Sequence, residues 1–322
     1  MELRADAPVA LPRTRRLGDR AGDGILYGLT AAAAIAAALL VAAIAWKVVD
    51  GAWPSMRHFG FSFLWTSEWN PVTNQFGALQ FVLGTLITSF AAVILATPLS
   101  IAIGLFLSEL APRAIRGPVG TLIEMLAAVP SVVVGLWGIL VMAPWVARHV
   151  EPALASAFGF VPFFGGAPSP SGLLPAILVL TIMIVPITSS ICRELFIGVP
   201  RDLEEGALAL GATRWEMVRG VVLPYAKGGV VAAVILGLGR ALGEAIAVTQ
   251  VIGNASTLSH SLYGPGDTLA SRIANQYQGA VTHLQVASLV YLAAILLAIT
   301  LITNVAAQLL VRRFEFQKTG GD

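Results

Sequence analysis

The sequence predicts an all-α membrane protein with six transmembrane helices. Hydrophobic residues make up 57% of the 322 residues and charged residues only 12%, whereas a soluble domain carries about 25% charged residues. The hydrophobic residues are also gathered in long blocks, and a helix needs roughly 20 such residues to cross a bilayer. Continuous blocks of this length favour helices over the short alternating strands of a β-barrel.

Six hydrophobic blocks are long enough to be spans. They are Ile25–Val49, Leu79–Leu107, Val119–Val141, Leu173–Ile191, Val230–Ile252 and Val286–Val311. Pro98 predicts a kink in the second block, because proline has no backbone N–H to donate within a helix. This transmembrane domain, residues 25–311, is flanked by polar tails at residues 1–24 and 312–322. The first tail is rich in arginine and lacks the apolar run and cleavage site of a signal peptide.

Lysine and arginine are unevenly distributed between the segments that join the spans. Cytoplasmic segments of membrane proteins carry an excess of these residues, and most of the 20 fall inside if both termini are cytoplasmic. The basic residues expected outside are Lys47, Arg57, Arg148 and Arg272. The net charge of +2 therefore reflects membrane orientation and does not indicate binding to nucleic acid.

Three segments are expected as outer loops: residues 50–77, 144–171 and 253–283. The first is rich in aromatic residues, which predicts either an interfacial helix or aromatic belt, or a contact surface for a partner outside the cell. The second and third contain clusters of proline, glycine and serine, which are typical of loops.

A charged, helix-forming segment separates the fourth and fifth blocks. Asp202–Leu210 indicates a short helix that stops at Gly211, where glycine can turn the chain at no steric cost. Thr213 and Glu216 have the Thr-x-x-Glu spacing of a capping box, which would start a second short helix. Leu223–Pro224 is expected to end that helix before the next span.

The spacing within this segment resembles the cytoplasmic coupling loop of ATP-binding-cassette importer permeases. That pattern is Glu-Ala-Ala, three residues, Gly, nine residues, then Ile-x-Leu-Pro. Gly206 replaces the first alanine and Val221 the isoleucine. The resemblance implies that residues 199–227 bind a partner ATPase, whereas an ordinary amphipathic loop is the alternative. The residues expected to couple to the ATPase are Glu205, Gly206, Ala207, Gly211, Thr213, Glu216, Leu223 and Pro224.

Two charged residues, Arg240 and Glu244, lie inside the fifth block. A charge at mid-membrane costs at least about 2.5 kcal/mol, so such residues are usually paired and functional. Their i, i+4 spacing predicts that they share a helix face and neutralise each other. Gly239 and Gly243 have the Gly-x-x-x-Gly spacing of close helix packing. An arginine there can donate two hydrogen bonds to an oxyanion, and a purely structural ion pair is the alternative.

The stretch G-R-A-L-G-E-A-I-A-V-T, followed by Gly253-Asn254, resembles the fifth-span signature of phosphate-specific importer permeases. Glu124–Gly138 resembles their third-span signature, although Val134 stands where the family often has tyrosine. The resemblance covers roughly residues 80–310. It implies the six-span type I importer permease fold, a bacterial plasma-membrane location, and a role for Arg240 and Glu244 in phosphate passage.

Other polar residues are weaker candidates. Thr249 and Asn254 follow Glu244 towards the outer face and are expected either to solvate an anion in the substrate pathway or to join helices by hydrogen bonds. Glu124, near the inner end of the third block, is expected to be a paired or snorkelling carboxylate, or a gating residue.

The chain contains no Gly-x-x-x-x-Gly-Lys-Ser/Thr motif, so it is not expected to bind or hydrolyse ATP by that route. Its one cysteine, Cys192, can form no disulfide within the chain, and no spacing indicates a metal site. The resemblance implies a non-enzymatic permease without its own cofactor, with Mg-ATP bound by the partner ATPase dimer. It further implies a second, similar permease, an extracytoplasmic phosphate-binding protein and surrounding lipid.

The sequence thus favours the permease subunit of an ATP-driven importer of inorganic phosphate. A permease for sulfate or molybdate is the first alternative, because the coupling pattern does not distinguish oxyanions. A secondary carrier or channel that needs no ATPase is the second. A membrane sensor of phosphate that uses the same partners is the third.

Overall fold

The computed structural model describes residues 17–257 and 259–316. Most of the predicted tail at residues 1–24, and residues 317–322 of the other tail, lie outside the described residues. The chain divides into two units, residues 1–47 and 48–322, which are described separately. The first unit contains the beginning of α1, which starts at Leu17, within the predicted tail.

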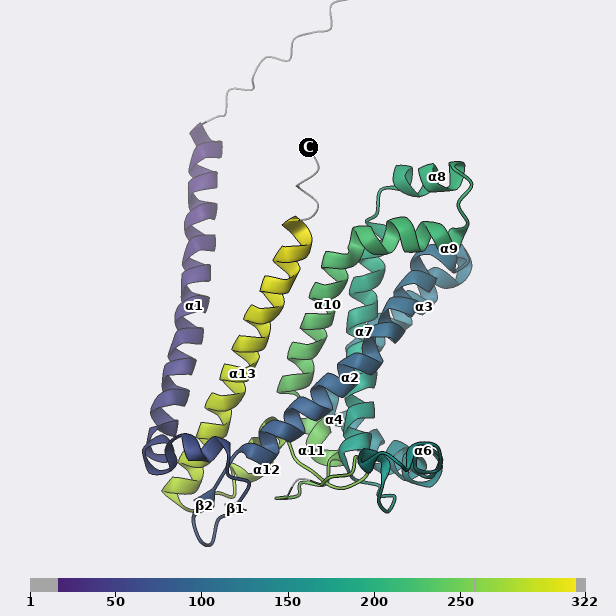
Figure 1. Cartoon of the computed structure of the whole chain (residues 1–322). Coiled ribbons are helices and arrows are strands. Elements are labelled where there is room, and N and C mark those ends of the chain that lie inside the picture. Colours follow the sequence, from purple (N-terminus) through teal and green to yellow (C-terminus); the bar gives the residue numbers. More distant parts are fainter. Residues whose placement is uncertain (1–16, 258, 317–322) are drawn as a thin grey trace, which may run out of the picture. The chain divides into compact units, whose positions relative to one another are not determined.

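Helices dominate the described residues, as the sequence predicts (Figure 1). The α-helices are α1 Leu17–Phe59, α2 Leu79–Leu105, α3 Arg113–Ala127, α4 Ser131–Trp137, α5 Ala143–Trp145, α6 Glu151–Phe158, α7 Leu173–Ile197, α8 Arg201–Ala209, α9 Arg214–Met217, α10 Leu223–Gly243, α11 Ile246–Val251, α12 Leu269–Gln276 and α13 His283–Phe316. Wider π-helical turns cover Phe106–Leu110, Gly138–Met142, Val146–Val150 and Val218–Val222. Short 3₁₀ helices cover Gly60–Leu64 and Pro162–Phe164, and β1 (Trp69–Asn70) pairs antiparallel with β2 (Gln75–Phe76).

Six helical segments among the described residues are long and apolar enough to cross a membrane, which confirms the predicted number. They are Gly22–Leu64, Leu79–Leu110, Ser131–Phe158, Leu173–Ile197, Arg214–Gly243 and His283–Leu309. Within the second unit, α8 and α9 lie at one end of the helices, whereas β1, β2, α6 and α12 lie at the opposite end (Figure 1). The segment predicted for coupling and the predicted outer loops are therefore at opposite ends, as a membrane-spanning arrangement requires.

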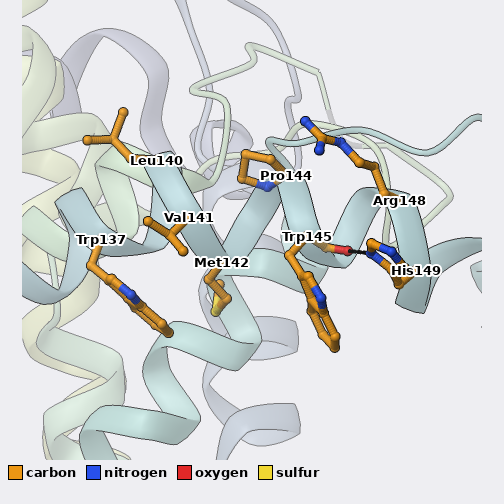
Figure 2. A pocket seen from close by; sticks show the side chains of 8 residues that line it. All are labelled: Trp137, Leu140, Val141, Met142, Pro144, Trp145, Arg148 and His149. Carbon is orange, nitrogen blue, oxygen red and sulfur yellow. Dashed lines mark hydrogen bonds between the residues drawn. The ribbon is translucent and has the colours of Figure 1, made fainter.

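The third span differs from the prediction of Val119–Val141. The helix breaks between α3 and α4 at Pro130, because a proline disfavours helical geometry at the residue before it. The span then continues through Pro144 to Phe158, so the predicted outer loop at residues 144–171 begins as helix. Two π-helical turns flank Pro144 and redistribute backbone hydrogen bonds there. Figure 2 shows the side chains along this stretch from Trp137 to His149.

The fifth span, predicted as one helix over Val230–Ile252, is interrupted. α10 ends at Gly243, and Glu244 has φ −73° and ψ 116°, an extended conformation, before α11 begins at Ile246. The Glu244 carboxylate accepts a hydrogen bond from the Ala247 backbone N–H at 3.3 Å. This N–H is in the first turn of α11 and has no partner within the helix, so the side chain stabilises the restart.

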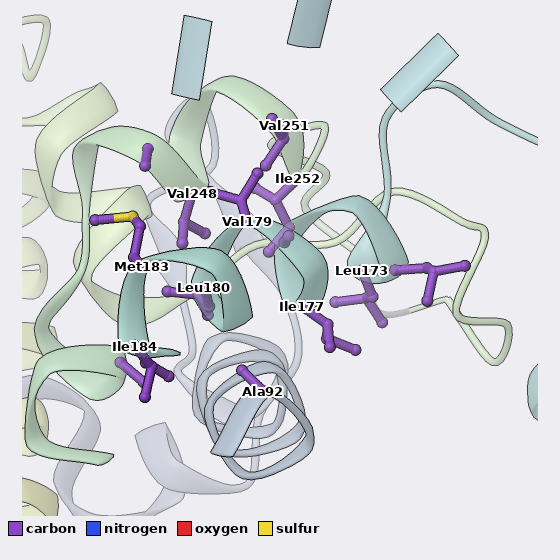
Figure 3. Close-up of a cluster of buried hydrophobic side chains, with 14 of the residues drawn as sticks. Ala92, Leu173, Ile177, Val179, Leu180, Met183, Ile184, Val248, Val251 and Ile252 are labelled. Atoms are coloured by element: carbon purple, nitrogen blue, oxygen red, sulfur yellow. The ribbon is translucent and has the colours of Figure 1, made fainter. Parts of the chain in front are cut away.

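The core is centred on α7. In the most apolar stretch of α7, 61% of residues are buried, against 28–33% for the other spans of the second unit. α7 contacts α2, α10 and α11, and its side chains interdigitate with theirs (Figure 3). Ile177, Leu180 and Ile184 are fully buried there, and each buried aliphatic side chain contributes roughly 1.5–3 kcal/mol.

A second cluster lies at the N-terminal ends of α2 and α13. Phe63 stacks on Tyr291 with ring centroids 4.4 Å apart, and Trp69 of β1 meets Phe81 of α2 edge-on at 5.2 Å. The predicted aromatic belt or contact surface at residues 50–77 is therefore wrong for these side chains, because they are buried in the fold. Trp65 remains 76% exposed.

Candidate functional site

The coupling segment, residues 199–227, begins with α8 and a glycine turn. The Ala212 N–H donates to the Ala207 carbonyl at 3.2 Å, and the Gly211 N–H donates to the Leu208 carbonyl at 3.0 Å. These two bonds form a Schellman motif, which places Gly211 in a left-handed conformation with φ +87°. The predicted stop of the helix at Gly211 is confirmed.

The predicted capping box is also confirmed. The Thr213 hydroxyl accepts from the Glu216 N–H at 3.3 Å, and the Glu216 carboxylate accepts from the Thr213 N–H at 2.8 Å. Two backbone donors at the start of α9 are thereby satisfied by side chains. The local sequence alone therefore fixes both the end of α8 and the start of α9.

The expectation that Leu223–Pro224 ends the second short helix is wrong. α9, the π-helical turn Val218–Val222 and α10 form one continuous helical segment, Arg214–Gly243. The Leu223 N–H donates to the Val218 carbonyl, five residues back, so the wide turn shifts the hydrogen-bond pattern just before Pro224. Pro224 has no backbone N–H. After this shift the helix needs no hydrogen-bond donor at that position, so the proline does not end the helix.

Apolar side chains of the coupling segment are exposed. Leu210 is 91% and Trp215 66% exposed. A groove of about 530 Å³ separates α8 and α9 from the C-terminal end of α2, with Glu204 and Glu109 among its lining residues. Burial raises the pKa of the Glu204 carboxyl, and the negative charge of Glu109 raises it further. An exposed apolar surface beside acidic residues is typical of a protein-binding surface.

Glu124 lies on α3, outside the third span. Its carboxylate pairs with the Arg193 guanidinium of α7 at 3.4 Å, and α3 packs against α7. The interpretation of Glu124 as a paired carboxylate that joins two helices agrees with this contact. A gating role stays a prediction.

A polar groove of about 580 Å³ opens along α10 and α13 at mid-span. Its lining residues are Ile187, Ile235, Leu236, Gly239, Arg240, Gly243, Glu244, Thr300 and Asn304. The structure thus brings Arg240 and Glu244 to one site, as the sequence predicts. It adds Thr300 and Asn304 of α13, which sequence reasoning missed. Their i, i+4 spacing inside the last apolar block is the signal that could have identified them.

Arg240 and Glu244 do not neutralise each other, and that prediction is wrong. No ion pair within 4 Å joins their side chains in the described part of the chain. The i, i+4 argument assumes a continuous helix, whereas Glu244 leaves α10 in an extended conformation. The Arg240 guanidinium is exposed and free to bind another group.

Within the described residues of this chain, Gly239 and Gly243 do not mediate close helix packing, so the expectation is wrong for packing inside the subunit. A methyl group added at Gly243 would meet no atom within 4 Å, and one added at Gly239 would meet only the Asn304 Oδ1 at 4.0 Å. The two glycines instead leave the space beside Arg240 open.

Thr249 and Asn254 do not line this groove. The Thr249 hydroxyl donates to the Ser271 hydroxyl at 2.9 Å, and Ser271 donates to the Asn254 Oδ1 at 3.1 Å. The Asn254 Nδ2 donates back to the Thr249 carbonyl at 2.9 Å. This closed network joins α11 to α12, which fits the helix-joining interpretation. A role for either residue in the substrate pathway stays a prediction.

Arg272 and Asp267 form a buried ion pair that the sequence does not reveal. The two side chains are 2% and 0% exposed, and the Arg272 Nε lies 2.7 Å from the Asp267 Oδ2. Burial raises the pKa of Asp267, and the Arg272 charge opposes this rise. Arg272, which was expected only to lie in an outer loop, is part of the core.

An apolar groove of about 520 Å³ lies along the third span, where Figure 2 shows Trp137, Met142 and Trp145. The Trp145 and His149 rings stack with centroids 5.4 Å apart, and Arg148 also lines the groove. This groove shares no lining residue with the polar groove.

Solved structures with a similar fold include two ABC transporters. The alginate ABC transporter in complex with an alginate-bound periplasmic protein has a TM-score of 0.59 and 19% identity, with 92% of this chain and 99% of that chain covered. The inward-facing MetNI methionine ABC transporter has a TM-score of 0.55 and 19% identity, with 73% and 95% covered. These likenesses show a shared fold.

Sequence comparison identifies the family. Residues 100–316 match the family model described as the binding-protein-dependent transport system inner membrane component. The phosphate transport system permease protein PstC of Pasteurella multocida is 47% identical over 306 residues, which are 94% of this chain and 95% of that protein. PstC of Mesorhizobium japonicum is 45% identical over 297 residues, 91% of each. The chain therefore belongs to the family of binding-protein-dependent transport system inner membrane components.

Proposed function

We propose that this chain is a permease subunit of an ATP-driven importer that moves inorganic phosphate into the cytoplasm. The observation that carries this proposal is the polar groove, in which the Arg240 guanidinium has no counter-ion among residues 17–257 and 259–316. A planar guanidinium suits the bidentate recognition of a phosphate oxygen pair. The named function of the PstC relatives, which cover more than 90% of the chain, supports phosphate as the anion.

ATP hydrolysis belongs to a partner. The chain has no P-loop, so an ATPase dimer would bind Mg-ATP, and the exposed apolar side chains of the coupling segment would fit into it. Because α9 and α10 are continuous, a movement of the coupling segment would travel along a single helix to Arg240. ATP binding would thus change the access of the groove from the cytoplasm to the outside.

A second permease would complete the groove. Arg240 is exposed at mid-span, where contact with lipid would be costly, so a protein surface is expected to cover it. A similar but distinct permease subunit fits this position. A phosphate-binding protein would deliver substrate at the outer end, opposite α8 and α9, and both termini would be cytoplasmic.

The assay for this function is uptake of labelled phosphate into liposomes that hold this chain, the second permease and the ATPases, with binding protein outside. ATP-dependent uptake that survives excess sulfate and molybdate is the expected result. Uptake that either competitor abolishes would move the assignment to another oxyanion. Uptake without ATPase subunits would indicate an ATPase-independent carrier.

Replacing Gly211 with valine is expected to reduce ATPase binding. The φ of +87° is unfavourable for a β-branched residue by about 1–2 kcal/mol, so the turn between α8 and α9 would rearrange. The amount of ATPase that co-purifies with the permease pair should fall roughly five- to thirtyfold. Gly228→Val is the control, because Gly228 lies in α10, outside residues 199–227, and has no neighbour within 4 Å. Equal retention in both variants would contradict a coupling role for the turn.

A further inference from the structure

The polar groove contains hydrogen-bond acceptors as well as a cation. The Thr300 hydroxyl donates its proton to the Leu296 carbonyl at 2.8 Å, so only the lone pairs of its oxygen are available to a ligand. Thr300 is therefore an acceptor in this groove. Arg240, by contrast, can only donate.

Glu244 supplies a second acceptor. Its Oε1 is bonded to the Ala247 N–H at 3.3 Å, whereas no described residue donates to Oε2. The carboxylate is held in place by α11, and it lines the same groove as Arg240 without being paired to it. The groove thus offers a donor and two acceptors that are held by hydrogen bonds, and the Asn304 amide can act as either.

This combination has a chemical consequence for oxyanions. Inorganic phosphate and arsenate keep at least one O–H proton at neutral pH, whereas sulfate and molybdate keep none. A carboxylate repels a fully deprotonated dianion but accepts a strong, charge-assisted hydrogen bond from a P–OH group. Binding an anion that cannot donate to a buried or partly buried acceptor costs binding free energy, because the acceptor is left without a hydrogen bond.

We propose that Glu244 and the Thr300 oxygen accept the two O–H protons of dihydrogenphosphate while Arg240 binds a charged oxygen, so that the permease itself selects protonated oxyanions. This inference rests on the proposed function, because it concerns the same groove. It assigns Thr300 as a specificity-determining residue on α13 and gives Glu244 a role other than neutralising Arg240.

The experiment measures how anions protect a thiol introduced into the groove by Leu236→Cys. Leu236 lines the groove and is exposed, whereas Cys192, the one native cysteine, is fully buried. The complete complex of permeases and ATPases is treated with N-ethylmaleimide, without binding protein, so that selectivity belongs to the permeases alone. The rate of labelling of this chain is followed against phosphate, arsenate or sulfate concentration.

Phosphate and arsenate are expected to protect at concentrations at least about tenfold lower than sulfate. Adding Thr300→Val should weaken protection by phosphate and arsenate several-fold without weakening that by sulfate. Thr303→Val is the matched control, because Thr303 makes the same bond to the Ile299 carbonyl at 2.7 Å but does not line the groove. Adding Glu244→Gln should bring sulfate to within about twofold of phosphate, because an amide can donate to it.

The two proposals fail differently. Equal protection by sulfate and phosphate in the Leu236→Cys chain, or an unchanged ratio in Thr300→Val, would overturn the selection of protonated anions while leaving phosphate passage intact. No protection by phosphate, or protection that persists in Arg240→Gln, would remove the groove from the pathway and with it both proposals. If Glu244→Gln does not assemble, Thr300→Val alone decides the question.

Discussion

Replacing Arg240 with glutamine is expected to reduce ATP-dependent phosphate uptake at least tenfold while the complex still assembles. The guanidinium is exposed in the groove and makes no ion pair with Glu244, so the fold does not depend on its charge. Glutamine keeps a polar side chain but loses the charge and the paired donors. A hydrogen bond to a charged group contributes about 1.5–3 kcal/mol, which corresponds to roughly 10- to 150-fold.

The measurement is uptake in proteoliposomes, with the amount of assembled complex checked by size-exclusion chromatography. Arg148→Gln is the control, because Arg148 lines the apolar groove along the third span and does not line the polar groove. Loss of uptake in Arg240→Gln alone would place the guanidinium on the path. Normal uptake in both variants would show that the groove does not carry the anion.

Replacing Arg272 with methionine is expected to destabilise the protein by about 3–5 kcal/mol. The guanidinium is ion-paired to Asp267, donates to the Ala255 carbonyl at 2.9 Å and lies 4.6 Å from the centroid of the Phe81 ring. Methionine would fill part of the volume but would leave the Asp267 carboxylate buried without a partner. A shift in thermal unfolding of the purified complex measures the loss.

The double variant Arg272→Met, Asp267→Asn separates charge from packing. Removing both charges leaves no buried ion, so this variant is expected to be more stable than Arg272→Met alone. A double variant no more stable than the single one would show that the cost comes from packing against Phe81 rather than from the unpaired carboxylate.

The loss of folding stability caused by Arg272→Met should also depend on pH. Burial already raises the pKa of Asp267, and loss of the opposing Arg272 charge would raise it further. A carboxyl with a folded pKa above its unfolded value binds protons more tightly when folded, so stability falls as pH rises between these two values. The difference in stability from the parent should therefore narrow when pH is lowered from about 8 to 5. A difference that stays constant over this range would contradict a charged Asp267.

Local chemistry explains what the sequence predicted well. Each span could be predicted because a bilayer-crossing helix needs a long apolar block, and such a block is visible in one continuous stretch of sequence. The end of α8 at Gly211 and the capping box of Thr213 and Glu216 were found because their hydrogen bonds join residues no more than five positions apart. The break at Pro130 could have been found from the restriction that a proline places on its predecessor.

The incorrect predictions concern contacts between segments. The predicted pairing of Arg240 with Glu244 is wrong because α10 ends before Glu244 and α11 begins as a separate helix. The position of α11 is set by its packing on α4, α7 and α12. The burial of Arg272 was not predicted, because the Trp69 and Phe81 rings that cover its guanidinium come from distant parts of the chain. Leu223–Pro224 was expected to end a helix because the sequence does not show the wide turn that precedes it.

The sequence by itself thus determined the six spans, the coupling segment and the presence of a charged pair within the fifth span. These depend on hydrophobic length and on short-range backbone hydrogen bonds, which are encoded locally. Only the tertiary structure decided that this pair is separated, that Thr300 and Asn304 join it, and that the coupling segment continues into α10. Those features depend on how α13, α11 and α7 pack around α10, because side chains far apart in sequence meet only when the helices are assembled.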